Sequence, residues 1–329
     1  MSGLLKKLGF SLIPVIVVGA AAELGLRSAG WPQITEAFEH NTPFWVTDPS
    51  LARKPFPHKE ENTVFRVSSN KDGLRSAKVE RAKPEGSHRI MTLGCSTTFG
   101  WGVDDSETYP ARLAELIAAE HGDAIQVING GQPGYTSFQG LWLWQHTLQH
   151  YKPDVVLLGY VVQDARKAAY SDKSQAVLQG DHRFLKHNVL YNSRAYLALR
   201  SVLGGVQVKA KERPQNGQGG IYRVPPEDYV DNLRAFVEDI QDMGSTPVLF
   251  GFPLERGGYT EEHRKILKAA ATQLKIPHLD LQSRMETASR QAELYFKRDR
   301  GHANAKGNAQ IAEWVYEFLK TEGLLKVDK

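Results

Sequence analysis

From residue 88 onward, short apolar runs alternate with amphipathic stretches. The apolar runs predict strands over 88–93, 125–128, 154–162, 246–252 and 276–281. Apolar residues at helical spacing predict helices over 109–120, 137–151, 229–243 and 305–319. Strands that are apolar on both faces and alternate with helices are typical of right-handed βαβ units. The pattern therefore predicts an α/β fold, a three-layer α/β/α sandwich around a parallel, flavodoxin-like five-stranded sheet.

The same pattern divides the chain. Residues 28–85 are rich in Pro, Lys and Glu and are predicted to be a linker and lead-in, whereas 86–325 form the main domain. Between about 166 and 226 the alternation lapses, which predicts an insertion. Because loops over the carboxyl ends of parallel strands often carry binding functions, the insertion is a candidate lid; a surface excursion is an equal alternative.

Residues 1–27 have the pattern of a signal peptide or an N-terminal membrane anchor. Lys6 and Lys7 precede an apolar run over 8–22. As a helix, about fifteen residues span roughly 22 Å, less than the ~30 Å hydrocarbon core. The small residues 20–22 favour a cleaved signal, and the leucines on either side, over about 4–26, favour a retained anchor. Both place the remainder on the periplasmic or extracellular side of the cytoplasmic membrane. A buried helix of a soluble domain is the third alternative.

Charge and cysteine content exclude some classes. The chain has 41 basic and 37 acidic residues, a net charge of +4, and its basic residues form no stripe. Nucleic acid is therefore not an expected partner. The single cysteine, Cys95, permits no internal disulfide.

Ser96, Asp299 and His302 are the candidate catalytic residues. Ser96 follows the first predicted strand between Cys95 and Thr97, where its Oγ is expected to face a crevice at the carboxyl ends of the strands. Asp299 precedes His302 by three residues, before the last helix. A carboxylate at that spacing can orient the imidazole that takes the serine proton.

Other candidate chemistry is weaker. His146 and His150 lie one helical turn apart, but no third ligand is in view, so no metal is expected. The glycine-rich segments lack the Gly-Lys-Ser/Thr ending of a phosphate loop. No cofactor is expected.

Taken together, the serine after the first strand and the Asp-x-x-His before the last helix resemble the SGNH (GDSL-type) hydrolase superfamily. The resemblance covers residues 88–320 and includes a second block over 127–137. The segment 70–75, Asn-Lys-Asp-Gly-Leu-Arg, resembles the lead-in of membrane-tethered or secreted bacterial members.

The resemblance implies an oxyanion hole made by the backbone N–H groups of Ser96 and Gly134 and by the side-chain amide of Gln163. Two positions depart from the family pattern. Cys95 stands where the family has Asp, which implies a small packed residue, with a competing thiol nucleophile as the alternative. Gln163 stands where the family has Asn and adds one methylene. Asp164 is expected to be a structural hydrogen-bond acceptor.

These residues imply a serine esterase or acylhydrolase acting on an ester-linked acyl or acetyl group, with transfer to an acceptor hydroxyl as a related outcome. The expected partners are an acylated small molecule or glycan and, if the N-terminal segment is uncleaved, the membrane. The alternative is a catalytically degraded SGNH-like domain that binds a glycan or an envelope partner, and its motivation is Gln163.

Overall fold

The structure is a computed structural model. It describes residues 2–31, 55–57, 64–76, 78–168, 170–179, 193–203 and 220–325. The chain divides into two compact units, which are considered separately: residues 1–42 with 167–221, and residues 43–166 with 222–329.

The second unit contains a five-stranded parallel sheet in the order β4-β3-β5-β8-β9. Its strands are β3 (His88–Gly94), β4 (Ile125–Asn129), β5 (Val155–Gly159), β8 (Thr246–Gly251) and β9 (His278–Asp280). This is the 2-1-3-4-5 order of flavodoxin-like sheets, so the predicted fold is confirmed.

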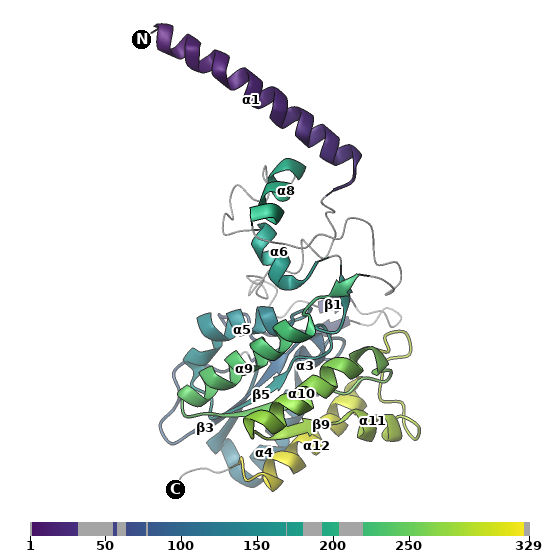
Figure 1. Cartoon of the computed structure of the whole chain (residues 1–329). Helices are drawn as coiled ribbons and strands as arrows, with labels where there is room; N and C mark the ends of the chain where they lie inside the picture. Colours follow the sequence, from purple (N-terminus) through teal and green to yellow (C-terminus); the bar gives the residue numbers. More distant parts are fainter. Residues whose placement is uncertain are drawn as a thin grey trace. The chain divides into compact units, whose positions relative to one another are not determined.

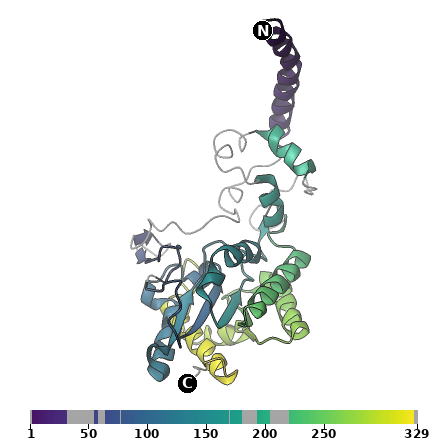
Figure 2. The ribbon, with the colours of Figure 1, turned by 90° about the vertical axis from the view of Figure 1, so that its left-hand side faces the viewer.

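Helices cover both faces of this sheet (Figures 1 and 2). On one face lie α4 (Tyr109–His121), α11 (Gln282–Ala288) and α12 (Ala305–Thr321). On the other lie α5 (Ser137–His146), α9 (Pro226–Asp242) and α10 (Glu261–Leu274). Successive residues of β3 serve the two apolar cores in turn, Ile90 on the α4 side and Met91 on the α5 side. This alternation is why Ile90, Met91 and Leu93 are all apolar although they do not face the same side of the sheet.

Several boundaries differ from the prediction. The helix predicted over 137–151 ends at His146, and a 3-10 turn over Leu148–Tyr151 completes the stretch. The third strand ends at Gly159, because the chain turns where Ala165 N–H donates to the Val161 carbonyl. Helices α10 and α11 were not predicted, although Leu267, Ala270, Ala271 and Leu274 follow helical spacing.

The lead-in joins the second unit upstream of the predicted boundary at residue 86. Strand β2 (Val64–Arg66) pairs antiparallel with β1 (Pro55–Pro57), and Leu74 is buried in the α5-side core. The Asn70 side chain forms the intervening turn, since its Oδ1 accepts the N–H groups of Asp72 (3.0 Å) and Leu74 (3.1 Å). The segment 70–75 is thus a structural motif of this unit.

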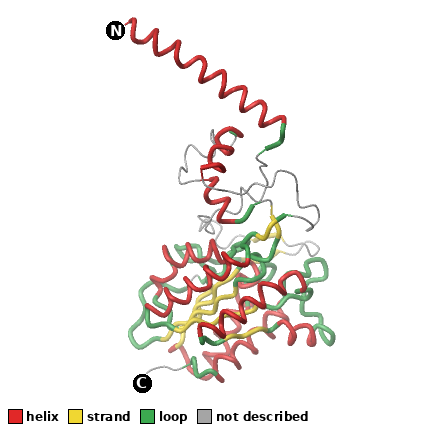
Figure 3. The backbone as a smooth tube through the Cα atoms, in the orientation of Figure 1, coloured by secondary structure: helices red, strands yellow, loops and turns green. Residues whose placement is uncertain are grey.

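The first unit is helical (Figure 3), with α1 (Ser2–Ser28), α6 (Asp172–Gln179) and α8 (Arg194–Leu203). The Glu23 carboxylate of α1 accepts the Arg194 N–H (3.0 Å), the Ala195 N–H (2.8 Å) and the Ser193 hydroxyl (3.0 Å). A carboxylate there satisfies N–H groups that a helix start otherwise leaves free. Most of the remaining insertion and residues 32–54 lie outside the described residues, as does any lid within them.

Within the part of the chain that the structure describes, no helix is both long and apolar enough to span a membrane. The signal peptide or membrane anchor predicted over residues 1–27 stays a prediction.

Candidate active site

Ser96 lies at the carboxyl end of β3, as the first residue of the four-residue helix α3 (Ser96–Phe99). Gly94 makes this abrupt change from strand to helix possible. A Cβ at residue 94 would lie 2.3 Å from the Thr98 Oγ1, and φ there is +158°. Ser96 is 8% exposed, so its hydroxyl lies just below the surface of the second unit.

Asp299 and His302 lie on the loop that leads into α12. A bridge between Tyr295 and Ala303 closes the loop at its base. Asn304 ends the loop as the cap of α12, with its Oδ1 accepting the Gly307 N–H at 3.0 Å. The cap holds His302 at the entrance of the helix.

The structure brings these three residues together in a hydrogen-bonded chain. The His302 Nε2 lies 2.8 Å from the Ser96 Oγ, and the His302 Nδ1 lies 2.9 Å from the Asp299 Oδ2. Because an ionised carboxylate only accepts, Nδ1 carries the proton and Nε2 is free to accept the serine proton. This arrangement is that of a nucleophile, a base and an orienting acid.

The loop after β4 brings Gly134 to the same end of the sheet. Gln132 N–H donates to the Gly94 carbonyl at 2.9 Å, which joins this loop to the start of the nucleophile turn. Gly134 has φ +79°, a left-handed conformation that favours glycine. Among the described residues, none accepts a hydrogen bond from the backbone N–H of Ser96 or of Gly134. Both groups are therefore free to donate to a bound oxyanion.

Gln163 follows β5, the strand next to β3, and is 9% exposed. Its Oε1 accepts a hydrogen bond from Arg223 Nη1 at 3.1 Å. The neighbouring Asp164 accepts the Ser137 N–H at 2.8 Å, which confirms its predicted role as a structural acceptor. Burial raises the pKa of Asp164, and its hydrogen bonds from Ser137 oppose the rise.

Residues 92–310, more than half of the chain, match the model of the GDSL-like lipase/acylhydrolase family. The chain belongs to this family. The match begins in β3, just before Ser96, and includes Asp299 and His302.

Individual relatives are more distant. An arylesterase of Vibrio mimicus is 31% identical over 77 residues, which is 23% of this chain and 38% of that protein. A lipase/acylhydrolase from Enterococcus faecalis has 18% identity, a TM-score of 0.49, and coverage of 74% of this chain and 99% of the other. A catalytic mutant of an acetylxylan esterase from Geobacillus stearothermophilus has 15% identity, a TM-score of 0.47, and coverage of 72% and 96%. These likenesses are too distant to carry function from one protein to another.

In this member of the GDSL-like family, Cys95 is 1% exposed and packs with Val161, Val162 and Leu254. Its Sγ lies 3.3 Å from the Thr97 Oγ1, away from the contact between Ser96 and His302. The packed-residue interpretation of Cys95 therefore agrees with the structure. Of the two histidines, His146 stacks on Trp142 at 4.2 Å between ring centroids. In the described residues no group of three His, Cys, Asp or Glu side chains could hold a metal ion.

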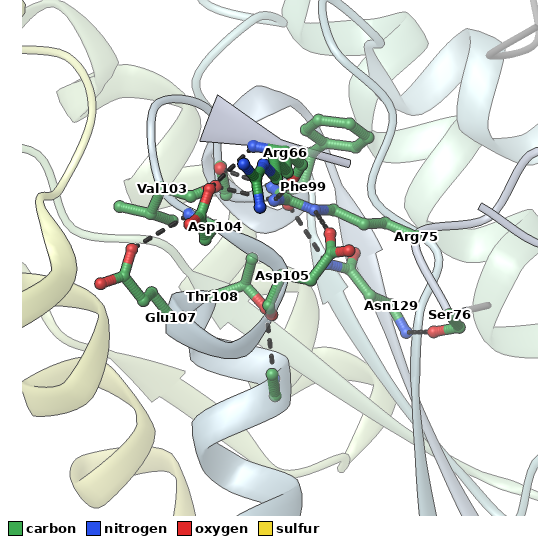
Figure 4. Close-up of polar contacts among 12 residues, drawn as sticks. Arg66, Arg75, Ser76, Phe99, Val103, Asp104, Asp105, Glu107, Thr108 and Asn129 are labelled. Atoms are coloured by element: carbon green, nitrogen blue, oxygen red, sulfur yellow. Dashed lines mark hydrogen bonds and ion pairs between the residues drawn. The ribbon is translucent and has the colours of Figure 1, made fainter. Parts of the chain in front are cut away.

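Arg75 supports the nucleophile turn through hydrogen bonds to its end (Figure 4), a role that sequence reasoning missed. All five of its N–H groups donate. Its acceptors are Asp105 Oδ1 and the carbonyls of Arg66, Phe99, Gly100 and Val103. Phe99 and Gly100 end the short helix that begins at Ser96. The available signal was the segment 70–75, whose final residue is this arginine.

Proposed function

We propose that this protein is a serine ester hydrolase. The observation that carries the proposal is the hydrogen-bonded chain from Ser96 through His302 to Asp299, with distances of 2.8 and 2.9 Å. Membership of the GDSL-like lipase/acylhydrolase family supports it. A degraded binding domain would have no need to keep nucleophile, base and acid in this alignment, so the enzyme is favoured over that alternative.

The reaction has two halves. Ser96 Oγ bonds to the acyl carbon while its proton moves to His302 Nε2, and the carbonyl oxygen becomes an oxyanion that accepts from the N–H groups of Ser96 and Gly134 and the Gln163 amide. The intermediate collapses, and His302 returns the proton to the departing alcohol. Water then attacks the acyl-enzyme with His302 as base, which releases the acid and restores Ser96.

The direct test combines an aryl-ester assay with fluorophosphonate labelling of the full chain. Wild type and Cys95→Ala are expected to be labelled and active, and Ser96→Ala to be unlabelled, with kcat reduced at least about 10³-fold. Cys95→Ala is the matched control because it changes the adjacent side chain and leaves the hydroxyl in place. Absence of both label and turnover in wild type, or label retained in Ser96→Ala, would overturn the proposal.

For the substrate, we propose an O-acylated small molecule or glycan, with transfer to an acceptor hydroxyl as a second fate of the acyl-enzyme. An alcohol that reaches the acyl-enzyme can replace water without any change in the residues that act. A panel of acetylated glycans and esters of increasing chain length, analysed for free acid and for transferred ester, separates these outcomes. Free acid alone, at all acceptor concentrations, would argue against transfer.

For location, we propose export from the cytoplasm. The support is the order of Lys6 and Lys7, an apolar run, and the small residues 20–22. Residues 1–30 fused to a reporter that is active only outside the cytoplasm are expected to yield activity, and fractionation of the full chain shows whether the segment is cleaved. A reporter that stays inactive would contradict export.

A further inference from the structure

Arg223 joins the two parts of the candidate oxyanion hole that come from different loops. It is 5% exposed. Its Nη1 donates to the Gly134 carbonyl at 2.8 Å and to the Gln163 Oε1 at 3.1 Å. Its Nη2 donates to the Gln139 Oε1 at 3.0 Å. One buried guanidinium thus fixes the peptide that follows Gly134 and the side chain that stands in the place of the family's asparagine.

The arginine is itself held firmly. Its backbone N–H donates to the Arg166 carbonyl at 2.8 Å, and the next residue, Val224, donates to the Asp164 carbonyl at 3.3 Å. Its partner Gln139 also accepts the Thr136 N–H at 3.1 Å, within the capping box of α5. The backbone of Arg223 and the acceptor at the end of its side chain are therefore both held by other parts of the second unit.

This contact decides which way the Gln163 amide points. A guanidinium can only donate, so the atom that faces Arg223 is the amide oxygen. The Nε2 group must then face away from Arg223, and among the described residues it donates to no other group. A glutamine side chain has one more rotatable bond than asparagine, and the hydrogen bond from Arg223 restrains it.

The segment that leads to Gln163 packs beside the nucleophile turn. Gly94 of β3 pairs with Gly159 of β5, and the chain continues from these residues to Ser96 and to Gln163. Cys95, next to the nucleophile, packs with Val161 and Val162, which immediately precede Gln163. The free N–H groups of Gly134 and Gln163 thus belong to loops that meet the turn carrying Ser96.

We propose that Arg223 is a positioning residue for the oxyanion hole: it sets the polarity and reach of the Gln163 amide, so that Nε2–H donates to the oxyanion in place of the family's asparagine. The inference rests on the proposed function. This role of Arg223 explains how the additional methylene of Gln163 is accommodated. Arg223 holds the amide oxygen of Gln163, and the amide nitrogen is then directed towards the oxyanion.

Gln163→Glu is the sharpest variant. It is nearly isosteric and keeps an acceptor for Arg223, but it loses the N–H donor and places negative charge beside the oxyanion. We expect kcat for an aryl ester to fall by about 10³-fold or more, with KM within about 3-fold of wild type. Gln163→Ala, which removes the donor without adding charge, is expected to lose about 10²–10³-fold.

Variants of Arg223 test the positioning role. Arg223→Ala is expected to lower kcat about 10–100-fold. Added guanidinium is expected to restore part of the lost kcat of Arg223→Ala and none of the lost kcat of Gln163→Glu. Arg223→Lys keeps the charge but lacks the planar guanidinium, whose two terminal nitrogens reach separate acceptors, and kcat is expected to fall about 10-fold. Arg234→Lys, at an exposed position on α9 that pairs with Asp231, is the control and is expected to match wild type.

The outcomes separate this inference from the proposed function. An unlabelled, inactive wild type overturns the proposed function and the inference with it. An active wild type with Gln163→Glu within about 3-fold of its kcat overturns the inference alone, as does Arg223→Lys with unchanged kcat. If loss of the guanidinium prevents Arg223→Ala from folding, Gln163→Glu and Arg223→Lys decide the matter, with thermal unfolding of each showing that it is folded.

Discussion

Ser96 and His302 are separated by 206 positions and meet at 2.8 Å. Ser96 begins α3 directly after β3, and His302 lies on the loop that leads into α12, a helix that packs against the sheet. Asp299 lies on the other side of the imidazole from Ser96; it is 7% exposed and accepts from His302 Nδ1. Its charge stabilises the imidazolium that forms as the serine proton is transferred, and its geometry selects the tautomer. At this scale the site depends on one hydrogen bond on each side of an imidazole ring.

Asp299→Asn tests that dependence. An amide nitrogen facing Nδ1 would favour the tautomer with the proton on Nε2, so His302 could no longer accept from Ser96. We expect kcat for an aryl ester to fall about 10³–10⁴-fold, with KM little changed. Asp123→Asn, at an exposed position in the turn after α4, is the control. A kcat for Asp299→Asn within tenfold of wild type would contradict the assigned role.

At the scale of elements, the lead-in and the nucleophile turn are held as one piece. Arg75 reaches from the lead-in to the carbonyls that end α3 and to the loop that precedes α4 (Figure 4). Its guanidinium also lies 4.9 Å from the centre of the Phe99 ring. Burial lowers the pKa of Arg75, while the ion pair with Asp105 opposes that change. A short helix that forms few internal hydrogen bonds is thereby stabilised from outside.

Arg75→Lys tests this support. A lysine ammonium can serve at most three acceptors, so buried carbonyls at the end of α3 lose their donors. We expect the free energy of unfolding to fall by about 3 kcal/mol or more. The measurement is urea unfolding followed by circular dichroism, with Arg234→Lys, expected to stay within about 0.5 kcal/mol of wild type, as the control. Equal midpoints for Arg75→Lys and wild type would rule this role out.

At the scale of the whole molecule, the N-terminal helix and the insertion form one compact unit, although 170 positions separate Glu23 from Ser193. The Glu23 carboxylate accepts three donors at the start of α8. The hydrogen bond from the Ala195 N–H makes the largest contribution to lowering the pKa of Glu23, from 4.5 to about 2. The last turns of α1 are therefore bound to a segment in the middle of the sequence.

The contact should weaken in acid. Because the pKa of Glu23 is lower in the folded state, its stabilising contribution is present above about pH 4.5 and is lost as the pH falls towards about 2. We expect protection of the Ala195 amide from hydrogen exchange, corrected for intrinsic rates, to decline over that window. Glu23→Gln should show weaker protection that does not change with pH there. Identical protection in both proteins at pH 6 would contradict the contact.

Part of the fold and of the candidate site could be predicted from residue patterns alone. The order of strands and helices, the position of Ser96 after the first strand, and the Asp-x-x-His spacing before the last helix are local features, and the sheet topology and family follow from them. The same local reasoning failed twice. Helices α10 and α11 were missed because their amphipathic periodicity was overlooked. Strand β5 was predicted too long because the turn that follows it is buried and apolar.

The sequence by itself determined which elements form and which residues carry the candidate chemistry, because hydrophobic period, turn residues and short motifs act between near neighbours. Only the tertiary structure decided how Gln163 is oriented, what supports the turn after Ser96, and what holds α8. Each depends on a hydrogen bond between distant residues: Arg223 is 60 positions from Gln163, Arg75 is 24 from Phe99, and Glu23 is 171 from Arg194. Such pairings leave no periodic signal, because they exist only once the chain has folded.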